Sequence, residues 1–114
     1  MKKCIFCDII SGKDKARIVY RDESATAFHD IHPVAPIHIL IVPNKHIASI
    51  NQLTQEDEQL IGHLFTTARH LASQLGIDVS GYRLIINTGP DAGQAVFHLH
   101  LHLIAGRRMR FPMG

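Results

Sequence analysis

Three histidines near the end of the chain, His98, His100 and His102, alternate with leucines. Side chains on an extended strand alternate between its two faces, so the three imidazoles share one face at separations of about 6–7 Å. Imidazole titrates near neutral pH, binds metals and transfers protons. The row is therefore open to three interpretations: the polar face of an amphipathic strand, a zinc site, or a catalytic site.

In the catalytic interpretation, His100 is a nucleophile and its neighbours position a phosphate and stabilise its charge. Two other features favour this chemistry. Asp30 lies where a strand is expected to end, and its carboxylate could accept hydrogen bonds from both hydroxyls of a ribose. The glycine-containing loop at residues 87–94 could present backbone N–H groups to a phosphate. Together with the histidine row, these features indicate a nucleotide site.

The hydrophobic pattern predicts the elements that must position these residues. A short helix is predicted over residues 5–11, and a long helix from Thr54 to Gly76. Strands are predicted over residues 17–21, 25–29, 37–42, 82–86 and 96–104. Because short connections favour antiparallel pairing, we expect an α+β fold. It would consist of a five-stranded antiparallel sheet, one long helix and a short N-terminal helix.

The long helix is expected to bury one broad stripe of side chains against the sheet. Its members recur at spacings of three and four residues or lie beside those positions: Leu60, Ile61, Leu64, Phe65, Ala68, Leu71, Ala72 and Leu75. Two histidines of the same helix, His63 and His70, lie off this stripe, and we expect them to be solvated.

The composition, with 46% hydrophobic and 19% charged residues, indicates one compact domain over residues 1–114. The net charge is only +2, and no nucleic-acid-binding motif accompanies Arg107, Arg108 and Arg110, so a nucleic acid is not an expected partner. The chain shows no secretory signal, and its longest apolar run is too short to span a bilayer. We therefore expect a cytoplasmic protein with no membrane partner, whose two cysteines are thiols or metal ligands.

The histidine row is one of several segments that together resemble a known family. These segments are residues 28–31 (Phe-His-Asp-Ile), 35–38 (Ala-Pro-Ile-His), 43–46 (Pro-Asn-Lys-His), Asn87, 93–94 (Gly-Gln), 98–104 and the tail from Gly106-Arg107 to Phe111-Pro112. The chain resembles the histidine-triad family over nearly its whole length. It is most similar to the branch of Hint-type purine nucleoside phosphoramidases.

The resemblance implies a role for each matching position. His100 would form a transient nucleotidyl-histidine, His98 and His102 would flank the phosphate, and His38 would be the fourth histidine of the site. Asp30 would hold the ribose hydroxyls. The other nucleotide-binding residues that it implies are Phe6, Ile9, Phe28 and Ile31 around the base, with Asn87, Gly93 and Gln94 near the phosphate or leaving group. No cofactor is required for this chemistry.

The resemblance also implies a metal site and an oligomer. Some bacterial members bind structural zinc through a cysteine pair, here Cys4 and Cys7, with two histidines at the positions of His46 and His98. Two cysteines and two histidines form a closed tetrahedral ligand set. The alternative is a pair of buried thiols with His46 on the surface. Members of the branch are homodimers, so Phe111 would reach the partner's site as a specificity residue.

The leading hypothesis is an enzyme that hydrolyses purine nucleoside 5′-phosphoramidates to the monophosphate and an amine. One alternative is a dinucleoside polyphosphate hydrolase, and another is a non-catalytic nucleotide- or zinc-binding regulatory module. The chain departs from the family at Ala95, where many relatives carry a serine whose hydroxyl reaches the phosphate or leaving group. We therefore expect an altered rate or leaving-group preference.

Overall fold

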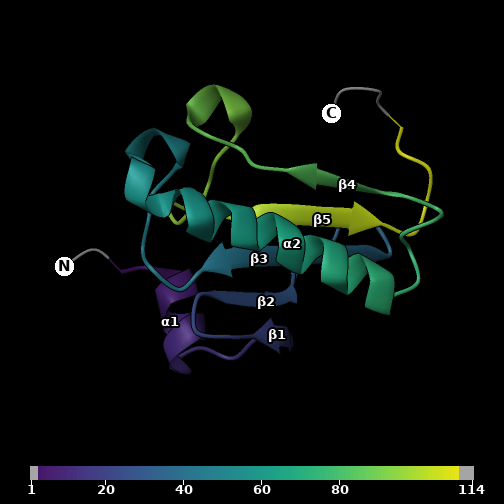
Figure 1. The fold of residues 1–114 in the computed structure, drawn as a ribbon, viewed down its shortest axis with the longest axis horizontal. Coiled ribbons are helices and arrows are strands. Elements are labelled where there is room, and N and C mark those ends of the chain that lie inside the picture. The colour runs from purple at the N-terminus through teal and green to yellow at the C-terminus, as the bar shows by residue number, and fades with distance from the viewer. Residues whose placement is uncertain (1–2, 111–114) are drawn as a thin grey trace.

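The computed structural model describes residues 3–110, which form one five-stranded antiparallel sheet and two α-helices (Figure 1). The strands lie side by side in the order β1-β2-β3-β5-β4. Their bounds are β1 Ile18–Arg21, β2 Ala25–His29, β3 Ile37–Pro43, β4 Tyr82–Ile85 and β5 Leu101–Ala105. The predicted α+β fold, with its five-stranded sheet, long helix and short N-terminal helix, is confirmed.

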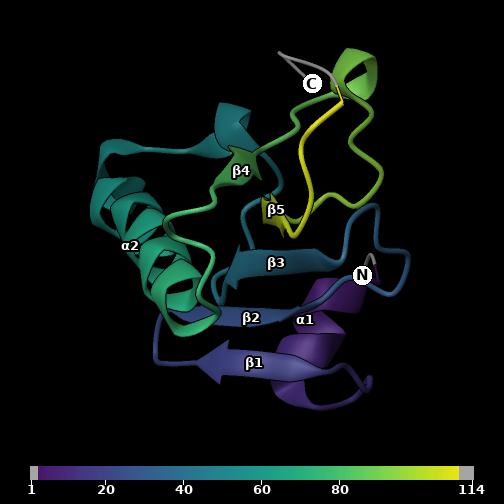
Figure 2. The ribbon, with the colours of Figure 1, turned by 90° about the vertical axis from the view of Figure 1, so that its right-hand side faces the viewer.

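The two helices cover opposite faces of the sheet (Figure 2). Helix α1, Ile5–Ser11, has Cys4 as its N-cap and ends at Gly12, whose φ of 87° is readily adopted only by glycine. Helix α2, Glu58–Gln74, follows a 3-10 turn at Gln55–Asp57. No helix among residues 3–110 is both long and apolar enough to cross a membrane.

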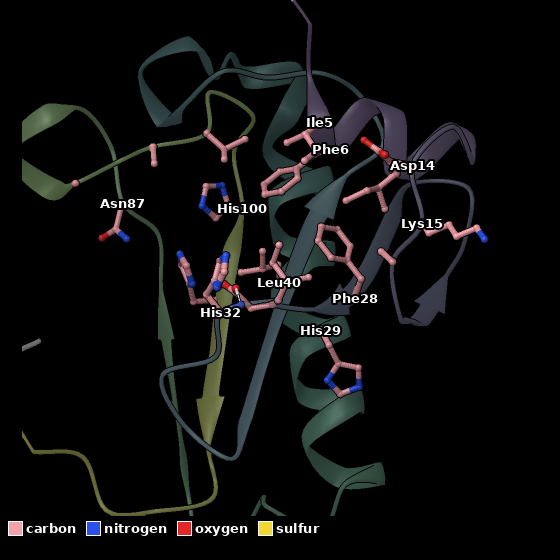
Figure 3. A pocket seen from close by; sticks show the side chains of 18 residues that line it. Ile5, Phe6, Asp14, Lys15, Phe28, His29, His32, Leu40, Asn87 and His100 are labelled. Carbon is pink, nitrogen blue, oxygen red and sulfur yellow. Dashed lines mark hydrogen bonds between the residues drawn. The ribbon is translucent and has the colours of Figure 1, made fainter.

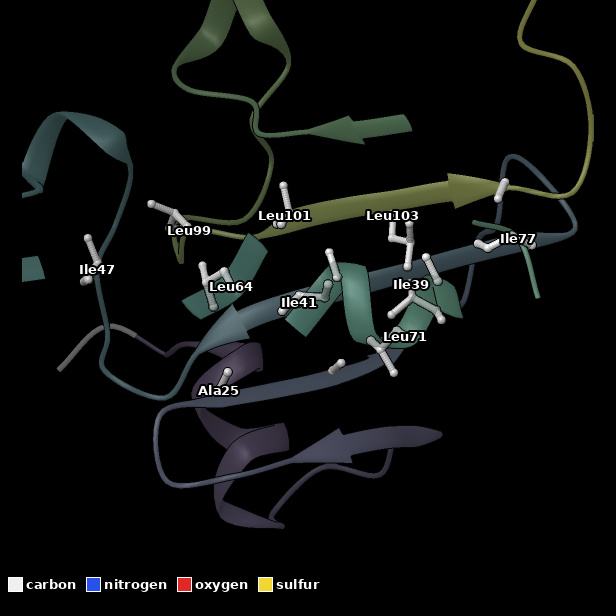
Figure 4. Close-up of a cluster of buried hydrophobic side chains, with 14 residues drawn as sticks. Ala25, Ile39, Ile41, Ile47, Leu64, Leu71, Ile77, Leu99, Leu101 and Leu103 are labelled. Carbon is white, nitrogen blue, oxygen red and sulfur yellow. The ribbon is translucent and has the colours of Figure 1, made fainter. Parts of the chain in front are cut away.

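The main core fills the space between α2 and one face of the sheet (Figure 4). On β3 this face carries Ile39 and Ile41, and on β5 it carries Leu101 and Leu103, all at most 1% exposed. On the opposite face is a second, smaller cluster, in which Phe6 and Ile9 of α1 pack against Phe28 of β2 and Leu40 and Val42 of β3. The alternation of side chains along β3 therefore divides the interior into two separate clusters.

One expected element is shorter than the sequence suggests. We predicted a strand over residues 96–104, but β5 begins only at Leu101. The preceding segment is held by contacts outside the sheet ladder: the Val96 carbonyl accepts from the Gln94 side chain at 3.1 Å, and Leu99 N–H donates to the Ile47 carbonyl at 2.7 Å. The alternation of hydrophobic residues continues across both segments, so the sequence pattern could not reveal this boundary.

The helical stripe is also narrower than predicted. Leu64, Leu71 and Ala72 are buried, but Phe65 and Leu75 are 42% and 43% exposed. His63 is not simply solvated, because its Nε2 lies 2.6 Å from Oδ2 of Asp22, which ties α2 to the β1–β2 hairpin.

Candidate active site

A cavity of about 580 Å³ opens on the side of the sheet that carries α1 (Figure 3). Its lining combines apolar side chains with histidines and one end of a glycine-containing loop. The lining residues are Ile5, Phe6, Ile9, Asp14, Lys15, Ala16, Phe28, His29, Asp30, Ile31, His32, Leu40, Asn87, Gly93, Ala95, Val96, His100 and His102. Its volume lies in the usual range for sites that bind small molecules.

The part of the cavity beside α1 is apolar and aromatic. The rings of Phe6 and Phe28 meet edge to face with centroids 5.4 Å apart. Leu40, on the same face of β3, completes this wall, whereas Ile31 lies at the rim and is 80% exposed. Such a wall offers flat contact surfaces to an aromatic ligand.

His100 faces this cavity and contacts the aromatic wall, with its ring centroid 5.1 Å from that of Phe6. Its Nδ1 lies 2.7 Å from the carbonyl oxygen of His98. Because a carbonyl only accepts hydrogen bonds, Nδ1 carries the proton. In the neutral ring, Nε2 therefore keeps a free lone pair, which is the state required of a nitrogen nucleophile.

His38 and His102 form a hydrogen-bonded pair whose direction is set by the backbone. Val34 N–H donates to His38 Nδ1 at 3.2 Å, so the neutral ring carries its proton on Nε2. That Nε2 lies 2.9 Å from His102 Nδ1, which must accept. The proton of His102 is therefore on its Nε2, which has no hydrogen-bond partner among the described residues. This N–H is therefore a buried, unpaired donor on a residue that lines the cavity.

Burial keeps both members of the pair neutral near pH 7. It lowers the pKa of His102 to about 4, and positive charge on His100 or His38 would act in the same direction. Burial also lowers the pKa of His38, although the neighbouring Asp30 carboxylate opposes this shift. A ligand with negative charge would favour an added proton on this pair.

Asp30 lines the cavity just after β2. Its Oδ1 accepts from the backbone N–H of His32 at 2.8 Å, and its Oδ2 lies 3.4 Å from His38 Nε2. Asp30, His38 and His102 lie close enough to hold a metal ion. However, the lone pair of His38 Nδ1 is taken by Val34 N–H, so an ion on Nε2 would require an anionic imidazolate. This cluster therefore suits hydrogen bonding and proton transfer better than metal binding.

The loop that closes the cavity opposite α1 contributes Asn87, Gly93 and Ala95. Gln94 is 7% exposed and is not among the lining residues. Its side chain instead holds the loop together: Oε1 accepts from Gly89 N–H at 3.0 Å, and Nε2 donates to the Ala48 carbonyl at 2.8 Å. Gln94 thus shapes the cavity without facing it.

A cluster of four metal-ligand side chains lies behind His100, formed by Cys4, Cys7, His46 and His98. From His98 Nδ1 the distance to Cys4 Sγ is 3.4 Å, to Cys7 Sγ 3.5 Å and to His46 Nδ1 3.2 Å. Cys7 Sγ lies 3.3 Å from His46 Nδ1. Tetrahedral zinc, with Zn–S of about 2.3 Å and Zn–N of about 2.0 Å, requires S···N distances of about 3.5 Å and N···N distances of about 3.3 Å.

The residues therefore fit a tetrahedral zinc ion in both donor type and spacing. His98 is also in the required tautomer, because its Nε2 donates to the Pro43 carbonyl at 2.8 Å and its Nδ1 lone pair faces the thiols. A backbone carbonyl behind a histidine ligand is the usual arrangement at metal sites. Burial further lowers the pKa of His98, which keeps its ring neutral for metal binding.

The structure brings most of the predicted site residues together, but not all in the same place. His38 and His98 stand behind the cavity wall and act on His102 and His100, respectively. Phe111 lies outside the described residues. Several lining residues were not predicted: Ile5, Asp14, Lys15, Ala16, His29, His32, Leu40 and Val96. Leu40 and Val96 had a usable signal, because alternation along the predicted strands places Leu40 on the same face as His38 and Val96 on the same face as His98.

Comparison with known proteins agrees with this geometry. The HIT domain family matches residues 11–109. The chain belongs to the HIT family. It is 47% identical to a purine nucleoside phosphoramidase of Escherichia coli over 113 residues, which cover 99% of this chain and 92% of the relative. An uncharacterized HIT-like protein of Synechococcus elongatus is 46% identical over 110 residues, 96% of each chain.

A crystal structure of a HIT family hydrolase from Legionella pneumophila superposes on this HIT protein with a TM-score of 0.95. The two sequences are 44% identical, and the match covers 98% of this chain and 100% of the other. The predicted histidine-triad membership is thus confirmed, and the predicted enzyme is confirmed as a hydrolase.

Proposed function

We propose that this HIT protein hydrolyses the P–N bond of purine nucleoside 5′-phosphoramidates, with His100 as the nucleophile. The observation that carries the proposal is the hydrogen bond from His100 Nδ1 to the His98 carbonyl, which leaves Nε2 free at the cavity wall. The 47% identity to a relative named purine nucleoside phosphoramidase supports the choice of substrate.

The cavity offers a contact for each part of a nucleotide. The aromatic wall of Phe6 and Phe28, with Ile9 beside it, suits the base. The Asp30 carboxylate suits the ribose hydroxyls, because a carboxylate accepts from two donors. Asn87 and Gly93, near His100 and His102, suit the phosphate or the leaving group.

In the first step, His100 Nε2 attacks the α-phosphorus, a P–N bond to His100 forms, and the bond to the amine breaks. The departing amine needs a proton. The anionic substrate favours an added proton on the His38–His102 pair, and the free Nε2–H of His102 delivers that proton to the amine. The pair returns to its neutral state.

In the second step, water attacks the phosphorus of the nucleotidyl-histidine. The proton of the water passes to the His38–His102 pair, the bond to His100 breaks, and the nucleoside monophosphate leaves. Two easier displacements thus replace one difficult one. The His98 carbonyl stabilises the positive charge on His100 in the intermediate through its hydrogen bond with Nδ1–H.

The direct test compares wild type with His100→Ala on adenosine 5′-phosphoramidate. Wild type should release AMP, and the variant should lose at least about 10³-fold in kcat because the covalent route is closed. His70→Ala, which changes an exposed histidine on α2, is the matched control and should keep full activity. Equal turnover by wild type and His100→Ala would reject the mechanism.

Two further measurements separate the alternatives. Denaturing the enzyme during turnover should trap an adenylyl group on His100, detected by mass spectrometry of peptides. Faster cleavage of dinucleoside polyphosphates than of phosphoramidates would identify a polyphosphate hydrolase. Tight AMP binding with no turnover on either substrate would identify a non-catalytic nucleotide-binding module.

We also propose that Cys4, Cys7, His46 and His98 hold a structural zinc ion. The support is the closed Cys₂His₂ donor set at tetrahedral spacing. Metal analysis of the purified protein should find one zinc per chain, and Cys4→Ala should reduce that content to near zero. A wild-type protein that binds no zinc in titrations would leave the cluster as two half-buried thiols beside one exposed and one buried imidazole.

A further inference from the structure

We propose that Cys4 and Cys7 are positioning residues for catalysis, because the metal cluster that they complete holds both the nucleophile and the wall of the base pocket. The inference rests on the proposed hydrolase and the proposed zinc site. It adds that the zinc ligands set nucleotide affinity and turnover, beyond any effect on folding.

The first link runs from the cluster to the nucleophile through a single residue. The ring of His98 contacts both thiols, while its carbonyl accepts from His100 Nδ1 at 2.7 Å. His98 lies before the start of β5, so the sheet ladder does not fix this carbonyl. The His98 ring is 0% exposed and is held by Pro43 and the cluster. The orientation of His100 therefore depends on how firmly that ring is held.

The second link runs from the cluster to the base pocket through α1. Cys4 is the N-cap of this helix, and its Sγ accepts from the backbone N–H of Cys7 at 3.2 Å. Between the two cysteines, Phe6 extends to the cavity, with its ring centroid 5.1 Å from His100 and 5.9 Å from His98. A seven-residue helix is marginal in isolation, so its position depends on such anchors.

The main core does not include the helix that carries Cys7, although Ile47 and Leu99, the neighbours of His46 and His98, belong to it. None of its buried members comes from α1, and it lies on the opposite face of the sheet, beneath α2. Loss of the thiol ligands should therefore loosen the nucleotide site while the sheet and α2 stay folded. This separation makes a positioning role distinguishable from a general contribution to stability.

The test uses three variants of the full chain. Cys7→Ala removes one ligand, Cys7→His replaces it with another zinc ligand, and Ser11→Ala changes an exposed side chain at the far end of the same helix. For each variant, zinc content, AMP dissociation constant, kcat, KM and the thermal unfolding transition are measured. The Nδ1–H proton of His100 is followed by NMR as a direct report on the nucleophile.

For Cys7→Ala we expect loss of zinc, an approximately tenfold weaker AMP affinity and an approximately tenfold lower kcat, the usual size of effects through residues that orient a site. The His100 Nδ1–H resonance should broaden or disappear, while cooperative unfolding is retained. Cys7→His should recover zinc, affinity and resonance together. Ser11→Ala should match wild type in every measurement.

Three outcomes would overturn the inference: a zinc-free Cys7→Ala with wild-type kcat, KM and AMP affinity; a Cys7→His that binds zinc without recovering the site; or a wild type that binds no zinc. A failure of the proposed hydrolase looks different. In that case no variant turns over phosphoramidate, but AMP affinity and the His100 resonance still report whether the cysteines control the site.

Discussion

At the residue scale, backbone groups decide what each histidine of the site can do. A carbonyl behind His100 and an N–H beside His38 are fixed partners, so they select the tautomers of those rings. Because His38 Nε2 donates to His102 Nδ1 at 2.9 Å, the proton of His102 lies on Nε2, which has no partner among the described residues. Identical side chains thereby offer opposite groups: Nε2 of His100 keeps a lone pair, as the proposed nucleophile requires, whereas Nε2 of His102 carries a proton, as the proposed donor requires.

The lowered pKa of His102 predicts a loss of stability in acid. Its pKa is about 4 in the folded chain and about 6.5 when unfolded, so the unfolded chain binds more protons between these values. The free energy of unfolding should therefore fall as the pH drops from about 6.5 to 4, with a contribution from His102 on the order of 3 kcal/mol. Urea unfolding at pH 7 and pH 4 measures this loss.

His102→Gln removes the titrating group and is the variant to compare. Its free energy of unfolding should depend less steeply on pH than that of wild type. An identical pH dependence in the two proteins would show that His102 is not the group responsible.

Ala95 predicts a gain of activity on substitution. It lines the cavity near Gly93, and its side chain has no polar group to offer a phosphate or leaving group. Ala95→Ser adds a hydroxyl, and a hydrogen bond to a charged group contributes about 1.5–3 kcal/mol, so kcat/KM should rise about tenfold or more. Ala16→Ser, which places a hydroxyl beside the apolar cluster under α1, should give no such rise. Steady-state kinetics on adenosine 5′-phosphoramidate measures both.

At the element scale, the loop before β3 positions the histidine pair and is itself braced by the turn after β5. Arg107 donates to the Val34 carbonyl at 2.8 Å, and Gly106 packs against Pro36. These contacts fix the loop whose Val34 N–H selects the tautomer of His38. The turn after β5 thus supports the site without lining it.

Gly106→Ala should destabilise the protein more than Gly12→Ala. Both glycines have positive φ, 98° and 87°, so each alanine costs on the order of 1–2 kcal/mol of backbone strain. At Gly106 a Cβ would also lie 2.8 Å from Pro36 Cβ, whereas nothing lies within 4 Å at Gly12. Chemical denaturation should show an additional loss of about 1 kcal/mol or more for Gly106→Ala. Equal losses of stability for the two variants would mean that the loop with Pro36 moves aside without a free-energy cost.

At the scale of the whole molecule, we propose a homodimer. Strand β4 lies at the edge of the sheet, and α2 exposes Phe65 and Leu75 at 42% and 43%. An open sheet edge and exposed apolar side chains are features that association with a second chain would cover. For the chain as a whole, a single domain over residues 1–114 and a cytoplasmic location stay predictions.

Sedimentation analysis should therefore give a mass near twice 12.7 kDa. Phe65→Glu should shift the protein toward the monomer because it places a charge on the exposed apolar part of α2. Val79→Glu changes a side chain that is 94% exposed outside α2 and should leave the dimer intact. A wild-type protein that sediments as a monomer at micromolar concentration would contradict the proposal.

Local patterns were sufficient to predict much of the fold. The helix at residues 5–11 and the strand at residues 25–29 were predicted with the observed bounds, because Gly12 and the turn residues at 22–24 mark where they begin and end. The strand at residues 96–104 was too long, since side-chain contacts from Gln94 and His98 replace the ladder there. Such contacts link residues distant in the sequence, as between His98 and Pro43, and leave no local signal.

The sequence by itself determined the chemical types at the site: the histidine row, Asp30, the cysteine pair and the aromatic residues near them. Only the tertiary structure decided which histidine does what. It turned His98 away from the cavity toward two thiols, placed His100 against Phe6, and directed the hydrogen bonds of His38 and His102 through the backbone. The reason is that a tautomer depends on what lies opposite each ring nitrogen, and here those partners come from separate elements of the fold.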